Sequence, residues 1–123
     1  MLTTFDKTLK VGVLASYKSN GWLWLSQLME EQYCVDCPVA KVDFDDETYI
    51  LQVRPFNPGV HYSMQSGWIA MYRIWSGGAV LYIPELLKFA HQYKRFGQYV
   101  PSYDENTGSI LINLNNKVKN YGR

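Results

Sequence analysis

Residues 67–93 read GWIAMYRIWSGGAVLYIPELLKFAHQY. Apolar and amphipathic residues alternate over 68–75, and 79–83 is a second short apolar run. The SGG sequence at 76–78 predicts a tight turn between them, because glycine adopts the positive φ that a hairpin turn needs. Both faces of the first strand are apolar or amphipathic, which is typical of a strand covered on both sides. The stretch therefore predicts a central, covered β-hairpin.

A helix is expected directly after this hairpin. Pro84 suits the first helical position, where its missing N–H costs nothing, and the helix dipole favours an acid such as Glu85 in the first turn. We expect the helix to run from Pro84 to about Phe96 and to end at Gly97. Basic groups on its outer face could bind phosphates while neighbouring aromatic rings stack on bases. The residues of this candidate nucleic-acid or partner-binding face are Lys88, His91, Lys94 and Arg95.

The region around Asn20-Gly21 fits two structures. Asn-Gly is a strong signal for a two-residue hairpin turn, and pairing across it would place Tyr17 opposite Trp24. Alternatively, apolar residues recur at helical spacing after the turn signal, and good helix formers follow them. We favour a helix over 20–32, with its apolar stripe formed by Trp22, Leu25, Leu28 and Met29.

The remaining strands define the predicted fold. Residues 41–53 alternate in polarity around an acidic tip, and we expect this hairpin to end at Arg54-Pro55 because proline interrupts a strand ladder. Short apolar runs at 11–15 and 109–114 supply further strands. The sequence thus predicts an α+β fold, with a mostly antiparallel sheet of five to seven strands and one or two helices packed on one face.

Composition limits the class of protein. The chain has 123 residues, 47% hydrophobic and 19% charged, which predicts a single folded domain over 1–123 with a mobile basic tail at 115–123. The net charge of +1 creates no global field toward nucleic acid or membrane. No apolar run approaches the roughly 20 residues of a membrane span. The opening residues do not resemble a signal peptide and there are two cysteines, so we expect a cytoplasmic protein with reduced thiols.

The Cys34-x-x-Cys37 motif allows two kinds of chemistry. Together with His61 and His91 it could supply four zinc ligands, although the histidines do not have the spacing of a zinc finger. A redox pair would stand at the start of a helix, where the dipole lowers a thiol pKa, and this pair does not. We therefore expect two ordinary cysteines and no cofactor. A small enzyme with an unrecognised Cys/His site remains an alternative.

The aromatic content indicates binding. Four Trp and ten Tyr are more than a core of this size hides, and exposed aromatic residues mark protein interfaces. Candidates for such an interface are Trp22, Trp75 and Tyr99. The sequence contains none of the motifs GxSxG, HExxH, Walker A or GxGxxG after a strand. We expect a small non-enzymatic interaction protein whose partner is a protein, with a nucleic-acid-binding domain that uses helix 84–96 as the alternative and homo-oligomerisation left open.

The segment YRIWSGGAVLYIPE, residues 72–85, is similar to the Asn/Ser-Gly-Gly-hydrophobic-x-x-Pro segment of plasmid antirestriction proteins. The order of a helix, an acidic hairpin and a Gly-Gly hairpin also resembles small proteins of bacterial plasmids and phages. The resemblance implies an accessory protein of a mobile element. It covers under a fifth of the chain, and no residue role is carried over from it.

Overall fold

The structure, a computed structural model, describes residues 2–4 and 15–118. Ten strands within these residues form one sheet in which all neighbouring strands are antiparallel. Their order across the sheet is β1-β9-β10-β5-β4-β6-β7-β3-β2-β8. The strands are β1 (Leu2–Thr4), β2 (Ala15–Tyr17), β3 (Trp22–Leu25), β4 (Val39–Asp45), β5 (Ile50–Phe56), β6 (Trp68–Arg73), β7 (Ala79–Tyr82), β8 (Gly97–Tyr99), β9 (Ser102–Asp104) and β10 (Ser109–Asn113).

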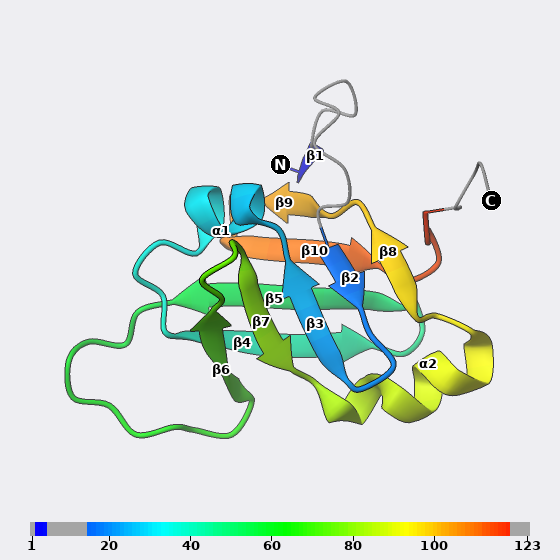
Figure 1. Ribbon diagram of the computed structural model, residues 1–123, viewed down its shortest axis with the longest axis horizontal. Helices are drawn as coiled ribbons and strands as arrows, with labels where there is room; N and C mark the ends of the chain where they lie inside the picture. Colours follow the sequence, from blue (N-terminus) through cyan, green and yellow to red (C-terminus); the bar gives the residue numbers. More distant parts are fainter. Residues whose placement is uncertain (1, 5–14, 119–123) are drawn as a thin grey trace.

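The sheet curls into a half-barrel. Figure 1 shows β10, β5 and β4 crossing behind β7, β3, β2 and β8 at a steep angle, as in orthogonal β-sheet packing. One hydrophobic core fills the space between the two halves. The segment after β10 returns to β8. Lys117 forms an isolated antiparallel β-bridge with Tyr99, and the Val118 N–H donates to the Gln98 carbonyl at 2.7 Å. This contact brings the two ends of the curl together.

Two short helices lie at opposite ends of the half-barrel (Figure 1). Helix α1 (Gln27–Tyr33) buries Met29, whereas the 3-10 turn η2 (Pro84–Leu86) and helix α2 (Leu87–Tyr93) bury Leu86 and Ala90. The prediction of five to seven strands with helices packed on one face is therefore wrong. Strands as short as β8 and β9 are too brief to show a two-residue period, and the helices fill the ends of the curl instead of covering a face.

The favoured helix over 20–32 is wrong in its first half. Residues on either side of Asn20-Gly21 form the β2–β3 hairpin, in which Tyr17 lies opposite Leu23 and Ser16 opposite Trp24. The hairpin alternative was right in kind, with a register one residue away from the expected pairing. Helical spacing was misleading because Leu23 and Leu25 enter the core on alternate strand positions, where both side chains are fully buried.

Helix α1 begins only after this hairpin. The Ser26 side chain accepts the N–H of Met29 at 3.3 Å, which makes Ser26 the N-cap. Ser26 is itself buried, so the cap is shielded from water. The helical prediction is thus confirmed for 27–32 and begins at a different cap.

The acidic hairpin is confirmed as β4 and β5. The Asp45 carboxylate accepts the N–H groups of Glu47 and Thr48 at the tip, and these hydrogen bonds lower the pKa of Asp45. The expected break at Arg54-Pro55 is wrong, since β5 continues to Phe56 and Pro55 lies opposite Ala40. On its other side β5 pairs with β10 only as far as Val53, so Pro55 occupies an edge, where proline is tolerated.

Two predicted segments lie partly outside the described residues. Of the strand predicted over 11–15, only Ala15 is described, and it begins β2. Of the tail predicted over 115–123, residues 115–118 are described. Asn115 donates its side-chain amide to the Thr48 carbonyl at 2.9 Å, and Lys117 Nζ donates to the Lys94 carbonyl at 3.1 Å.

Candidate functional site

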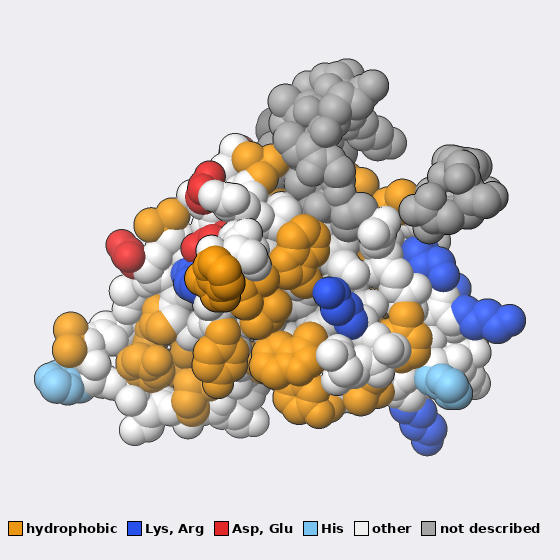
Figure 2. Space-filling view, viewed as in Figure 1, with side chains coloured by type: hydrophobic (Ala, Val, Ile, Leu, Met, Phe, Trp, Pro, Cys, Tyr) orange, Lys and Arg blue, Asp and Glu red, His pale blue; other side chains and the backbone are white. Residues whose placement is uncertain are grey.

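The outer face of β3, β6 and β7 is aromatic. The register places Trp22 opposite Tyr82, and Trp24 and Tyr72 on either side of Val80. We define the outer aromatic face as the five aromatic side chains on outward positions of these strands, Trp22, Trp24, Trp68, Tyr72 and Tyr82. Figure 2 shows hydrophobic side chains gathered in a broad band over the same strands.

This face corrects the expectation of a hairpin covered on both sides. The β6–β7 hairpin itself is confirmed, with Met71 opposite Leu81 and both side chains buried in the core. On its outer side, however, Tyr72 is 55% exposed and Tyr82 is 45% exposed. Apolar outward positions indicated a second covering layer, but in the described residues no helix or strand covers them. The rings are therefore available for contact with another molecule.

The rings on this face are inclined to one another. Trp22 lies 5.1 Å from Tyr82, between ring centroids, with an interplanar angle of 39°. Trp22 lies 6.2 Å from Tyr72 at 62°. Trp68 meets Phe56 edge to face, 4.8 Å apart at 80°. At these centroid distances the rings pack against one another, which holds them in place on the strands.

A hollow of about 410 Å³ opens among these rings. A second hollow of about 230 Å³ lies beside it, between β4 and η2, and the two share Trp68, Ile69 and Glu85 in their linings. Asp43 lines the second hollow. We call the first space the aromatic hollow; its lining includes Trp22, Trp68, Tyr72, Tyr82, Pro84 and Glu85.

The turn between β6 and β7 extends the exposed aromatic surface. Trp75 is fully exposed at this turn. Gly78 has φ +97°, and a Cβ at this position would lie 2.4 Å from the Leu25 carbonyl oxygen. Glycine is therefore required to hold the turn against β3 while Trp75 projects from it.

Of the three aromatic interface candidates, two lie at the surface. Trp22 is half-buried on the outer aromatic face and Trp75 is exposed. Tyr99 corrects the expectation, because its side chain is 1% exposed and its hydroxyl donates to the Arg95 carbonyl. Tyr72 and Tyr82 were not predicted as site residues. The apolar pattern on both faces of their strands could have indicated them, but it was interpreted as a sign of strands covered on both sides.

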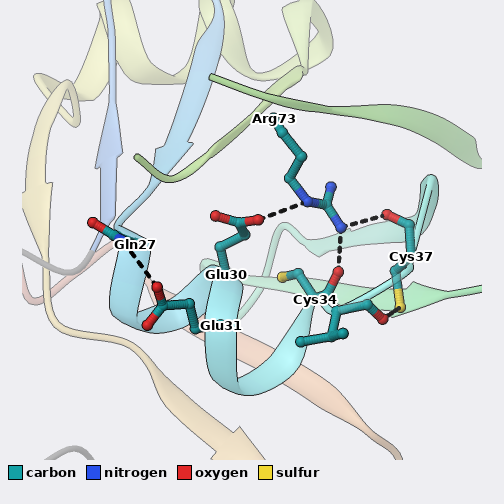
Figure 3. Close-up of polar contacts among 7 residues, drawn as sticks. Gln27, Glu30, Glu31, Cys34, Cys37 and Arg73 are labelled. Atoms are coloured by element: carbon teal, nitrogen blue, oxygen red, sulfur yellow. Dashed lines mark hydrogen bonds and ion pairs between the residues drawn. The ribbon is translucent and has the colours of Figure 1, made fainter. Parts of the chain in front are cut away.

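The CxxC segment is held by Arg73. Its guanidinium pairs with Glu30, Nε to Oε2 at 2.9 Å, and donates to the carbonyl oxygens of Cys34 and Cys37. Figure 3 shows the guanidinium facing these carbonyl oxygens. The contacts join β6 to the end of α1, where carbonyls lack helical partners and attract a cation. This arrangement is typical of a structural clamp.

Neither thiol is activated. Both cysteines are free, and Cys34 is buried. Burial raises the pKa of Cys34 to about 12, against the opposing effect of Arg73, and burial also raises the pKa of Cys37. Both side chains are therefore neutral at physiological pH, which disfavours nucleophilic or redox chemistry.

The proposed zinc ligands are not brought together. His61 lies in the exposed segment between β5 and β6, and His91 lies on α2. Figure 2 shows the histidine side chains at opposite ends of this face. Within residues 2–4 and 15–118, no group of three or more His, Cys, Asp or Glu is placed to hold a metal ion.

The basic face of helix 84–96 is shorter than expected. α2 ends at Tyr93, because Lys94 adopts the left-handed conformation (φ 57°) and the Arg95 N–H then bonds to the Ala90 carbonyl at 2.8 Å. The Arg95 guanidinium turns back and donates to the Tyr93 carbonyl at 2.8 Å. The exposed members of the expected set are thus Lys88, His91 and Lys94.

Comparison of the chain with protein-family models, curated proteins and solved structures found no match. In the part of the chain that the structure describes, no helix has both the length and the apolar character of a membrane span.

Proposed function

We propose that this chain is a non-enzymatic interaction protein that binds a partner protein through its outer aromatic face and Trp75. The observation that carries the proposal is the exposure of Tyr72 and Tyr82 beside Trp22 on the central strands of the sheet. Trp and Tyr are the residue types most enriched at the energetic centres of protein interfaces, because they bury a large area at low entropy cost.

The absence of charged side chains from the outward strand positions supports the proposal. The outward positions of β3, β6 and β7 carry only the five aromatic rings, Ala70 and Val80. A sheet face that remains in water usually carries polar residues on these positions. Interface centres are depleted of charged residues, as this face is.

The rigidity of the site supports it as well. The rings stand on hydrogen-bonded strands whose other face is anchored in the core by Leu23, Leu81 and Met71. Side chains held in this way lose little conformational freedom on binding. The same residues on flexible loops would lose conformational entropy on binding, because the loops would have to become ordered.

The nucleic-acid alternative has less support. It relied on four basic residues along one helical face, and Arg95 is now bonded to the helix end. Of the remaining exposed basic residues, Lys88 and His91 lie on α2, and Lys94 follows the last residue of this helix. The exposed Lys117 adjoins Lys94 and adds one basic residue to this set, which is still small for the concentrated basic patch of a phosphate-binding surface.

Site-specific photo-cross-linking tests the proposal. A benzophenone amino acid is placed at position 72 on the outer aromatic face and, as a matched control, at Thr107 in the exposed turn before β10. Cross-linking in cells of origin is expected to give a discrete heavier species from position 72 only. Mass spectrometry then identifies the partner and recognises a second copy of the chain.

The cross-linking experiment has outcomes that support the proposal and outcomes that contradict it. A cross-linked species from position 72 that disappears when Trp22 is replaced by Ala supports the proposal. Equal yields from positions 72 and 107, or no species from position 72, contradict it. Circular dichroism spectra and thermal melts of each variant establish that the fold is retained.

A further inference from the structure

We propose that the aromatic hollow receives a cationic side chain, lysine or arginine, of the partner protein. The inference rests on the proposed function and specifies its partner chemistry. Its structural basis is the combination of inclined aromatic rings with one carboxylate, that of Glu85, in the same hollow.

The ring geometry fits a cation. A cation is attracted to the face of Trp or Tyr when it lies within about 6 Å of the ring centroid, and Trp is the strongest acceptor. Tyr82 and Tyr72 flank Trp22 at 39° and 62°. All three rings line the aromatic hollow, so a cation within it lies close to more than one ring.

The charges in the lining fit the same ligand. Glu85 lines both hollows and Asp43 lines the smaller one, and no Lys or Arg is among the described residues that line either. Within the described residues Glu85 forms no ion pair, whereas Glu30 is bonded to Arg73. Asp43 also borders Lys41 and Arg54 on β4 and β5, so its charge is partly compensated. Glu85 is therefore the carboxylate available to a ligand.

Other occupants of an aromatic hollow would need different surroundings. A proline-rich segment also docks between aromatic rings, but it carries no charge for Glu85 to pair with. An acidic segment would be repelled by Glu85 and Asp43. A cation benefits from both the rings and the carboxylate.

The test uses three fluorescein-labelled ten-residue probes on the full chain. They are alternating Arg-Gly, alternating Glu-Gly and decaproline, with binding measured by fluorescence anisotropy at low and high salt. The Arg-Gly peptide is expected to bind most tightly. Glu85→Gln and Tyr82→Leu are each expected to weaken this binding roughly tenfold, since a desolvated cation–π contact or charge-assisted hydrogen bond contributes on that scale.

Matched variants control for nonspecific attraction. Glu47→Gln removes the same charge at the exposed tip between β4 and β5, and Tyr93→Leu removes a partly exposed aromatic ring on α2 that does not line the hollow. Both are expected to change affinity less than twofold. Tyr82→Phe keeps the aromatic ring and is expected to retain binding, which distinguishes the ring face from the hydroxyl. Thermal melts exclude unfolding as the cause of any loss.

Several results would overturn the inference. They are an equal loss in Glu47→Gln, tighter binding of decaproline or of Glu-Gly, and binding of Arg-Gly that is indifferent to Glu85→Gln. If position 72 still cross-links to a partner while the Arg-Gly peptide fails to bind, protein docking stands and its cationic chemistry is wrong. If position 72 gives no cross-link either, both proposals fail.

Discussion

The two faces of the β3–β7–β6 segment are both apolar, yet they are built from different residues. Aliphatic side chains on the inner face, such as Leu23 and Leu81, are fully buried. The outer face instead carries Trp22, Tyr72 and Tyr82, of which the two tyrosines are about half exposed. Aliphatic side chains interdigitate in a close-packed core, whereas aromatic rings with a polar edge tolerate water and bind well when covered. Hydrophobicity alone therefore did not distinguish the buried inner face from the exposed outer face, for which we propose a binding role.

Truncation on the inner face is expected to have the largest effect on stability. Leu81→Ala leaves a cavity among core residues and is expected to lower the free energy of unfolding by about 3–4 kcal/mol. Val80→Ala, its neighbour on the outer side of β7, is expected to cost about 1 kcal/mol or less. Urea denaturation followed by circular dichroism measures both. Equal losses would contradict the division between the faces.

Removal of the Arg73 clamp is expected to have the next largest effect. Arg73→Ala loses the pairing with Glu30 and the hydrogen bonds to two carbonyls at the end of α1. A loss of about 2 kcal/mol is expected, because the ion pair is partly exposed and the carbonyls lose a charged donor. Arg54→Ala, on an exposed position of β5, serves as the control and is expected to change stability by less than about 0.5 kcal/mol. A smaller loss for Arg73 than for Arg54 would show that the clamp is not structural.

Buried tyrosines should make the fold sensitive to alkali. Burial raises the pKa of Tyr17 and of Tyr99 to about 12, above the value near 10 of an unfolded chain. Between these values the unfolded state has released protons that the folded state retains, so stability falls as pH rises from about 10 toward 12. The double variant Tyr17→Phe/Tyr99→Phe is expected to show a flatter decline in urea midpoint over this window.

One of these two substitutions, Tyr17→Phe, is also expected to lower the stability at neutral pH. The Tyr17 hydroxyl donates to the Ile83 carbonyl at 2.6 Å, and its loss leaves this carbonyl with only the longer hydrogen bond from the Leu86 N–H, at 3.3 Å. Tyr17→Phe alone is expected to cost about 1–2 kcal/mol at pH 7. Tyr82→Phe, which loses an exposed hydroxyl, serves as the control and is expected to be nearly neutral. A pH profile identical to that of the parent protein would contradict the assignment to these two tyrosines.

The smallest stability effects are expected on the outer aromatic face. Tyr82→Ala loses its ring contact with Trp22, and cross-strand aromatic pairs contribute about 0.5–1 kcal/mol. Its effect on binding is expected to exceed its effect on stability, which is the pattern of an interface residue. Parallel measurement of melting temperature and cross-linking yield checks this. A stability loss as large as that of Leu81→Ala would indicate that the outer aromatic face is needed for folding and would contradict its interpretation as an interface.

Local sequence signals located the turns correctly. Gly77-Gly78 and the acidic tip after Asp45 both form the predicted hairpin turns, because their backbone conformations are decided by nearby residues. The Pro84 signal is similarly confirmed as the start of a helical segment. Its end was not predictable, since Lys94 adopts a left-handed conformation that is usually left to glycine.

Sequence patterns whose structure depends on residues far away in the chain could not be interpreted from nearby residues alone. Asn20-Gly21 fitted a helix or a hairpin until β7 and β8 were known to flank β2 and β3. The zinc candidates failed because the fold separates His61 from His91. Whether an apolar strand face is covered by a second layer or left open depends on the rest of the chain. This is why Tyr72 and Tyr82 were missed as site residues.

The strand order has a consequence for how the chain folds. β1 pairs with β9, and β5 receives β10 from the far end of the chain, with Val53 opposite Ile110. A nascent chain that ends before residue 109 leaves β5 as an open edge, which is prone to pair with other molecules. Completion of the sheet must therefore wait until β10, Ser109–Asn113, has left the ribosome. Because such non-local pairings dominate, refolding is expected in milliseconds to seconds, slower than that of a helical protein of similar length.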